Sequence, residues 1–284
     1  ESADLESASI LLGAAEKGHA TWLEPTPHAH LRLTAADYLI TKQLHLGLDF
    51  VGLPVVHRCQ VRSCGRELDG SRIGLLRHLA SHSPLSNTNL HNPLVRQVTA
   101  MCRLQGHSAA AGGEARGEDP TVPHSADVVV HNFRGAGRHC RIDVKTGYQF
   151  GVSTLVAAGP RARRYTARRE AACRLEHQPQ DVLPFVMTGT GQLGKDGEAF
   201  IREIHCLGGG IIGGGIEPTH STPNCSKYWH RRLRMFAFAG TATSLRQLVG
   251  IEAPLDVDLE GLLDEDDQQS LDDAVQHESA RLAE

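Results

Sequence analysis

The chain has 284 residues, of which 40% are hydrophobic and 22% charged, and this is enough for one sizeable core or two modest ones. It contains no run of 18 apolar residues, which excludes an evident membrane-spanning helix. The net charge of −4 combines a body, residues 1–250, at +7 with a tail, residues 251–284, that holds twelve acidic residues against one Arg. The basic body is compatible with a polyanionic partner. We expect the tail to be a solvated extension, and competition with nucleic acid for the basic face is the alternative.

The first predicted elements are helices. Residues 33–48 have helical spacing, with Thr34 as a plausible N-cap. Residues 91–106 have the pattern of an amphipathic helix, with Pro93 in its first turn and Gly106 after its end. The segment between these two helices holds a cluster of Cys and His residues.

The second half of the body alternates strands and helices. A Gly-rich loop over 108–121 precedes two β-type runs, 126–131 and 139–145, and Gly135 and Gly137 between them predict a hairpin. The remaining predicted elements are a helix over 157–177, a strand over 181–188, a helix over 195–205, a loop over 208–225 and a basic amphipathic helix over 226–248. This order predicts an α/β fold with a small mixed β-sheet flanked by helices.

Two acidic residues and a lysine occupy the predicted hairpin. Asp127 lies at the start of its first strand and Asp143 near the end of its second, so their carboxylates can converge, while Lys145 shares the face of Asp143. Two carboxylates suit Mg²⁺ or Mn²⁺, and a lysine can stabilise negative charge in phosphodiester hydrolysis. Glu114 is the candidate third carboxylate. The alternative is an ordinary surface pair at a strand end.

Cys59, Cys64, His78 and His82 have the spacing of a structural Zn²⁺ site. A helix over 72–82 would place both histidines on one face. Buried thiols beside surface histidines are the alternative. The seven cysteines are odd in number and mostly scattered, so a reducing, intracellular compartment is expected.

Two basic segments are candidates for contact with the phosphate backbone. Their selected residues are Arg161, Arg164, Tyr165 and Arg168 in the first, and Arg231 and Arg232 in the second. A solvated arginine face that merely covers each helix is the alternative interpretation.

Several of these motifs occur in the order found in one nuclease family. Ser125-Ala-Asp127 followed by Arg141-Ile-Asp143-Val-Lys145 resembles the PD-(D/E)xK nucleases, and the flanking motifs resemble the restriction-like endonuclease domain that follows the reverse transcriptase in some non-LTR retrotransposons. The flanking motifs are Thr21-Trp22-Leu23, Leu46-Gly47-Leu48, the Cys/His cluster, His91-Asn92, Arg161-Ala-Arg163-Arg164-Tyr165 and Leu183-Pro-Phe-Val186. The resemblance covers residues 20–250.

The resemblance implies a restriction-endonuclease-like fold preceded by a zinc knuckle, and a metal-dependent DNA endonuclease that makes nicks. It also implies DNA as substrate, a nuclear location and a reverse transcriptase domain in the same polyprotein; the missing initial Met agrees with a fragment. A catalytically inactive nucleic-acid-binding module and a remnant with structural value only are the alternatives. The expected division is a helical region 1–56, a knuckle 57–90, a nuclease core 91–207, a linker with basic helix 208–250 and a tail 251–284.

Overall fold

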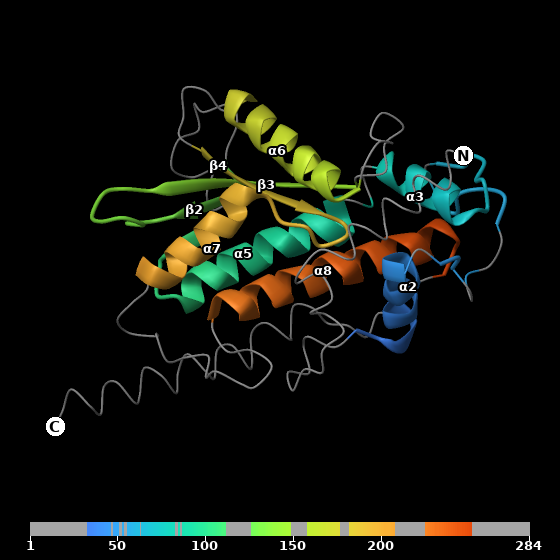
Figure 1. Cartoon of the computed structure of the whole chain (residues 1–284), viewed down its shortest axis with the longest axis horizontal. Coiled ribbons are helices and arrows are strands. Elements are labelled where there is room, and N and C mark those ends of the chain that lie inside the picture. Colours follow the sequence, from blue (N-terminus) through green and yellow to red (C-terminus); the bar gives the residue numbers. More distant parts are fainter. Residues whose placement is uncertain are drawn as a thin grey trace.

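The computed structural model describes residues 33–251, except 47, 51–52, 54–55, 63, 83–84, 86, 112–125, 149–157, 177–181 and 208–224. Within these ranges the chain forms a four-stranded sheet with α-helices on both faces (Figure 1). The predicted α/β class with a small mixed sheet is therefore confirmed, and a Cys/His cluster precedes the sheet as predicted. None of the described helices is long and apolar enough to cross a membrane. Glu114 and the acidic tail beyond Ile251 lie outside the described residues.

The sheet has the strand order β1-β2-β3-β4. Its strands are β1 Ala109–Ala111, β2 Val128–Val130, β3 Cys140–Gly147 and β4 Val182–Thr188. β1 is antiparallel to β2, and β2 is antiparallel to β3, whereas β4 runs parallel to β3. β1 falls inside the predicted loop, so that prediction is wrong for these three residues. Three alanines carry little intrinsic preference for a strand, and pairing with β2 places them in the sheet.

The predicted hairpin between β2 and β3 is confirmed. Gly135 and Gly137 have φ angles of 121° and 75°, a backbone conformation that costs glycine little. Asn132 also has a positive φ, 54°, and its Oδ1 accepts a hydrogen bond from the N–H of Gly137 at 2.9 Å. A short polar side chain that bonds locally tolerates this conformation, so the turn residues fix the reversal of the chain.

The predicted helices are present within the described residues. They are α2 Ala35–Leu46, α3 Arg72–Ala80, α5 Asn92–Leu104, α6 Ala158–Glu176, α7 Lys195–Leu207 and α8 Cys225–Leu248. Thr34 caps α2 as expected, because its Oγ1 accepts a hydrogen bond from the N–H of Asp37 at 3.1 Å. A π-helical turn, η3 Asn87–His91, leads into α5 and was not predicted.

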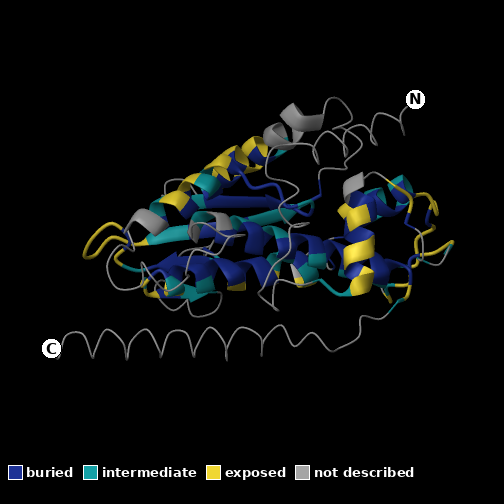
Figure 2. Cartoon of the chain, turned by 60° about the horizontal axis from the view of Figure 1, so that its bottom comes forward, coloured by how far each residue is buried: buried dark blue, intermediate teal, exposed yellow. Residues whose placement is uncertain are grey.

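α6 covers one face of the sheet, and α5, α7 and α8 lie on the other (Figure 1). On the second face a single hydrophobic cluster continues from Leu44 and Leu79 in the N-terminal helices to Ile142 and Phe185 in the sheet. α8 crosses this whole core and is largely buried (Figure 2). α8 therefore extends from the Cys/His region to the sheet.

The expectation that Arg231 and Arg232 face solvent is wrong, because they are 3% and 1% exposed. The Arg232 guanidinium donates to Oε1 of Gln97 at 2.6 Å and to the Tyr228 hydroxyl at 2.7 Å. It also lies 5.2 Å from the ring centroid of Trp229, where the aromatic face attracts a cation. These contacts hold the charge inside the fold, so neither arginine is placed to bind phosphate.

Candidate active site and Cys/His cluster

Asp127 directly precedes β2 and accepts two hydrogen bonds on one carboxylate oxygen. Oδ2 receives the backbone N–H of Val144 at 2.8 Å and faces Nε2 of His91 at 3.3 Å. The other oxygen, Oδ1, accepts none from a described residue. The carboxylate raises the pKa of His91, chiefly through this hydrogen bond and against the opposing effect of burial. Asp127 is thus fixed at the edge of β3 while its side chain stays 26% exposed.

Asp143 lies on β3 and is 5% exposed. Its Oδ2 lies 2.8 Å from Nζ of Lys145 and accepts a hydrogen bond from the Cys173 thiol of α6 at 3.2 Å. A buried carboxylate remains ionised only where such partners stabilise the charge. Burial and the neighbouring carboxylate together raise the pKa of Cys173 to about 12, so the thiol keeps its proton and acts as a donor.

Lys145 carries the cationic charge of this group. Partial burial opposes protonation, but the hydrogen bond and charge of Asp143, together with Glu176 at 3.6 Å, outweigh it and raise the pKa of the ammonium. Its side chain is 31% exposed, so the group is held by two carboxylates and still faces solvent.

Of the three residues selected from the hairpin pattern, Asp143 and Lys145 form an ion pair, and Asp127 accepts the backbone N–H of Val144, the residue between them. The local contacts that hold them were not predicted. Cys173 and Glu176 lie in a segment that showed only an arginine-rich helix, and they reach β3 through the packing of α6. The His91-Asn92 motif predicts no role for His91. Its position at the start of α5 was the available signal.

No third ligand joins Asp127 and Asp143 among the described residues. Within these ranges, only one set of three or more His, Cys, Asp or Glu side chains has its ligand atoms within 4.8 Å of one another, and that set is the Cys/His cluster. Two carboxylate groups with hard oxygen donors fit a divalent cation such as Mg²⁺, which keeps several waters and takes further ligands from substrate phosphate.

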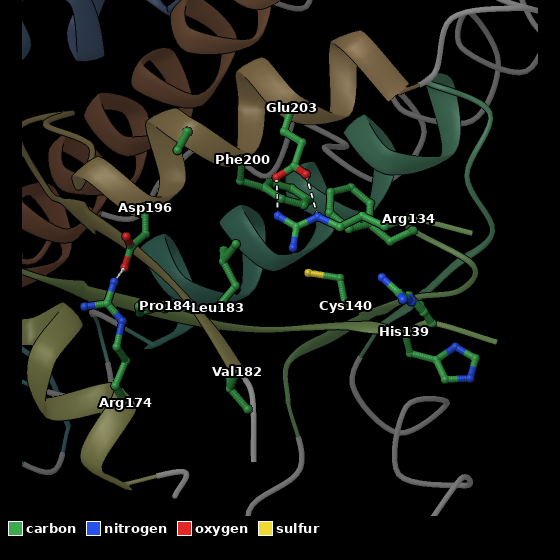
Figure 3. A pocket seen from close by; sticks show the side chains of 13 residues that line it. Arg134, His139, Cys140, Arg174, Val182, Leu183, Pro184, Asp196, Phe200 and Glu203 are labelled. Carbon is green, nitrogen blue, oxygen red and sulfur yellow. Dashed lines mark hydrogen bonds and ion pairs between the residues drawn. The ribbon is translucent and has the colours of Figure 1, made fainter. Parts of the chain in front are cut away.

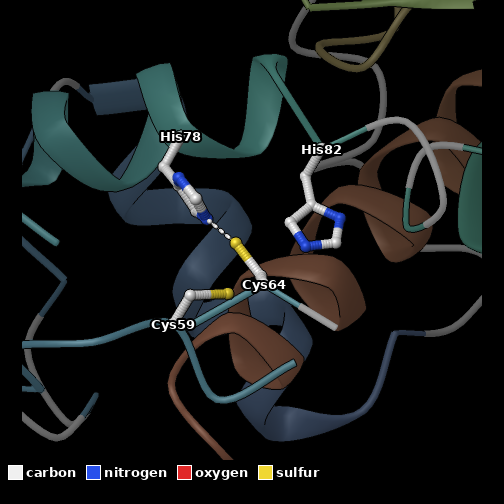
Figure 4. Close-up of side chains that lie close together, drawn as sticks. All are labelled: Cys59, Cys64, His78 and His82. Atoms are coloured by element: carbon white, nitrogen blue, oxygen red, sulfur yellow. Dashed lines mark hydrogen bonds between the residues drawn. The ribbon is translucent and has the colours of Figure 1, made fainter. Parts of the chain in front are cut away.

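The four cluster residues selected from spacing, Cys59, Cys64, His78 and His82, converge as expected and could hold a metal ion (Figure 4). Sγ of Cys64 lies 3.5 Å from Nε2 of His78. The two cysteines flank a tight turn, in which the N–H of Cys64 donates to the carbonyl of Val61 at 2.9 Å, and the N–H of Cys59 donates to the carbonyl of Arg66 just beyond the turn at 2.8 Å. Both thiols and both imidazoles therefore face one point.

The helical placement expected for both histidines is only half correct. α3 ends at Ala80, and Ser81 follows as its C-cap, so His82 lies beyond the helix. The backbone N–H of His82 still bonds to the carbonyl of Leu79 at 3.0 Å, which continues the turn and directs the imidazole toward the cysteines. The cluster thus joins the end of α3 to the preceding turn.

The first basic segment forms α6, as predicted. In the half of α6 whose side chains are described, one selected residue is exposed and another is half-buried. Arg168 is exposed, in agreement with a solvent-facing role. Tyr165 is half-buried, with the guanidinium of Arg169 5.7 Å from its ring centroid. Arg161 and Arg164 belong to α6, but their side chains lie outside the described residues.

Comparison of the chain with protein-family models, with curated proteins and with solved structures finds no match in any of the three.

Proposed function

We propose that this protein is a metal-dependent DNA endonuclease of the restriction-like type, which nicks DNA by phosphodiester hydrolysis. One observation carries the proposal: the Asp127 carboxylate accepts the N–H of Val144 in β3, and the preceding residue of β3, Asp143, has its carboxylate 2.8 Å from the Lys145 ammonium. The order of flanking motifs in the sequence supports the same class. The proposal includes a retrotransposon origin, DNA as substrate and a nuclear location.

Asp127 and Asp143 would hold Mg²⁺ or Mn²⁺ at the edge of β3, where Oδ1 of Asp127 accepts no hydrogen bond from a described residue. When bound, such a cation polarises the phosphoryl oxygen and lowers the pKa of a coordinated water. The residues of the chain supply the remaining effects. His91 and the backbone of Val144 orient Asp127, whereas Cys173 orients Asp143.

Lys145 is assigned the stabilisation of negative charge during phosphodiester hydrolysis. Its ammonium carries three N–H donors, and only part of this capacity is used by Asp143 and Glu176. The remaining donor capacity can orient the attacking water or stabilise negative charge as it develops on the phosphate. Because the pKa of the ammonium is raised, Lys145 is a charge stabiliser and not a general base at neutral pH.

We assign the Cys/His cluster to a structural zinc ion. Two thiolates and two imidazoles complete the four-coordinate sphere that Zn²⁺ prefers, which leaves no open position for substrate. The backbone N–H of Gln60, next to Cys59, donates to the carbonyl of Leu248 at 3.0 Å. Zinc would therefore stabilise the contact between the turn and the end of α8.

A nucleic-acid-binding module without catalysis is the second candidate function. One observation favours it: among the described residues, no third carboxylate or imidazole has its ligand atom close to both Asp127 and Asp143. In this case the fold and the Cys/His cluster would be retained for binding alone.

Nicking of supercoiled plasmid DNA tests the proposal and separates the two candidates. We expect Mg²⁺ or Mn²⁺ to be required, and Asp127→Asn and Asp143→Asn each to abolish nicking, because an amide is a poor ligand for a hard cation. Asp49→Asn, at an exposed position away from the sheet, is the matched control and should nick normally. A folded wild-type chain that binds DNA without metal-dependent nicking would leave the binding module as the function.

A further inference from the structure

The β2–β3 hairpin ends in an arm, residues 131–139, that projects past the end of the sheet (Figure 1). Six consecutive residues, 134–139, are exposed, and they include Arg134, Arg138 and His139. An exposed basic loop at the end of the sheet is a candidate contact for a polyanion. Because Arg231 and Arg232 of α8 are buried, any contact with DNA outside α6 must come from another surface, such as this loop.

Two hydrogen bonds and a buried aromatic contact hold the backbone at the base of the arm, next to Arg138. The N–H of Phe133 donates to the carbonyl of Arg138 at 2.9 Å, and the side chain of Asn132 accepts the N–H of Gly137. Phe133 is 4% exposed and lies 5.3 Å, centroid to centroid, from Phe200 of α7. A preorganised loop loses little conformational entropy when it binds.

A pocket of about 550 Å³ lies between the arm, the first residues of β4, and α7 (Figure 3). Val182, Leu183 and Pro184 form an apolar wall. The residues Arg134, Arg138, His139, Arg174, Asp196 and Glu203 supply its charged and titratable groups. A cavity with an apolar wall and a polar rim suits a ligand that has a flat apolar body and an ionic group.

The charges at the rim favour an anion. Arg134 binds Glu203 through two hydrogen bonds, at 2.5 and 2.7 Å, and Arg174 binds Asp196, so both acidic groups are already engaged. Arg138 forms no ion pair with a described residue, which leaves an excess of one positive charge. Arg134 and Arg174 are themselves more than half exposed, so their guanidinium groups still face solvent.

We propose that the arm and this pocket bind the DNA backbone at the end of the sheet, with Arg138 at a phosphate and the pocket around the adjoining nucleotide. The identity of the polyanion rests on the proposed function. Asp143 lies three residues along β3 from Cys140, which lines the pocket, a distance of about 10 Å at the usual rise of a strand.

Binding of a fluorescein-labelled DNA duplex as a function of salt tests the proposal. We use the Asp143→Asn chain, in which binding is measured without cleavage. The logarithm of the association constant K falls linearly with the logarithm of the salt concentration. Loss of one phosphate contact makes this slope shallower by about 0.9, which corresponds to about fivefold weaker binding at 0.15 M salt. We expect this change for Arg138→Ala. Arg202→Ala removes an exposed arginine of α7 that does not line the pocket, and should change neither quantity.

Ala199 gives an independent test of the pocket, because it is exposed and lines it. Ala199→Glu places a carboxylate at the rim and should weaken binding several-fold, whereas Ala199→Gln, of similar size, should bind with at most a small change. Unchanged binding by both Arg138→Ala and Ala199→Glu, together with nicking by the wild-type protein, would overturn this proposal alone. Weakened binding by these two variants, if the wild-type protein with Asp143 intact does not nick DNA, would support it and reject the nuclease.

Discussion

Gly240 lies where α8 crosses η3, and the substitution Gly240→Ala tests how tightly the two elements are joined. A β-carbon at this position would lie 2.0 Å from the carbonyl oxygen of Asn89 and 2.9 Å from its carbonyl carbon. A backbone contact this short cannot be relieved by side-chain rotation, so the two elements must separate. Nδ2 of Asn89 also donates to Ser244 at 3.0 Å and to Gln247 at 2.8 Å, and the separation would lengthen both bonds.

Gly240→Ala is expected to destabilise the fold, which is the opposite of the usual effect of this substitution in a helix. Gly→Ala in a helix interior normally stabilises by about 1 kcal/mol. Overpacking of a filled interior costs about 1–3 kcal/mol, and weakening of two hydrogen bonds adds about 1 kcal/mol. We therefore expect Gly240→Ala to lower the free energy of unfolding by about 2 kcal/mol, since these costs exceed the gain in helix propensity.

Urea unfolding followed by circular dichroism measures this difference. Ala239→Gly is the control for helix propensity. Ala239 is next to Gly240 and only half-buried, so this change should lower the free energy of unfolding by about 1 kcal/mol through helix propensity alone. Because η3 ends at His91, which faces Asp127, Gly240→Ala should also slow DNA nicking under conditions where the chain remains folded. A Gly240→Ala chain as stable as the wild type, or more stable, would refute the packing argument.

Three further predictions concern the metal, the lysine and pH. A chromophoric chelator should release about one equivalent of zinc from the wild type and none from Cys64→Ser, which should also unfold at lower temperature. Lys145→Met should slow nicking by about 10²–10³-fold with DNA binding retained, and equal rates would exclude its catalytic role. Burial, and then the charge of Asp196, raise the pKa of Glu170, although the hydrogen bond from the Asp196 N–H opposes this shift. The contribution of Glu170 to the free energy of unfolding is therefore lost as the pH rises through its folded-state pKa. Glu170→Gln should therefore gain stability relative to wild type at pH 7 but not at pH 4, and an equal difference at both pH values would contradict this.

Regular elements were predictable where one periodicity dominates a segment. α5 has apolar residues at helical spacing with Pro93 in its first turn, and it forms as expected. The hairpin followed from β-branched runs around Gly135 and Gly137. Because side chains alternate along a strand, the sequence also placed Lys145 on the face of Asp143. Local patterns therefore predicted both the scaffold and the three residues of the candidate site.

The remaining features depend on partners far away in the sequence. Nothing in the basic run of α8 indicates that Arg232 is buried, since its acceptor Gln97 lies on another helix. The same holds for Cys173, whose thiol meets Asp143 only because α6 packs on β4 beside β3. Helical periodicity reports which face of a helix is apolar, but not where buried polar groups find hydrogen-bond partners.

The two carboxylates of the candidate site are held by different parts of the fold. β2 begins only at Val128, so the carboxylate of Asp127 takes the N–H of Val144 and fixes itself to the edge of β3, with His91 of η3 beside it. Asp143 is held from the opposite side, by the thiol of α6 and by Lys145 of its own strand. The relative position of the two groups therefore depends on how η3 and α6 are each seated against the sheet. This explains why a helix as distant in sequence as α8, which packs on η3 through Gly240, bears on the geometry of a site to which it contributes no candidate ligand.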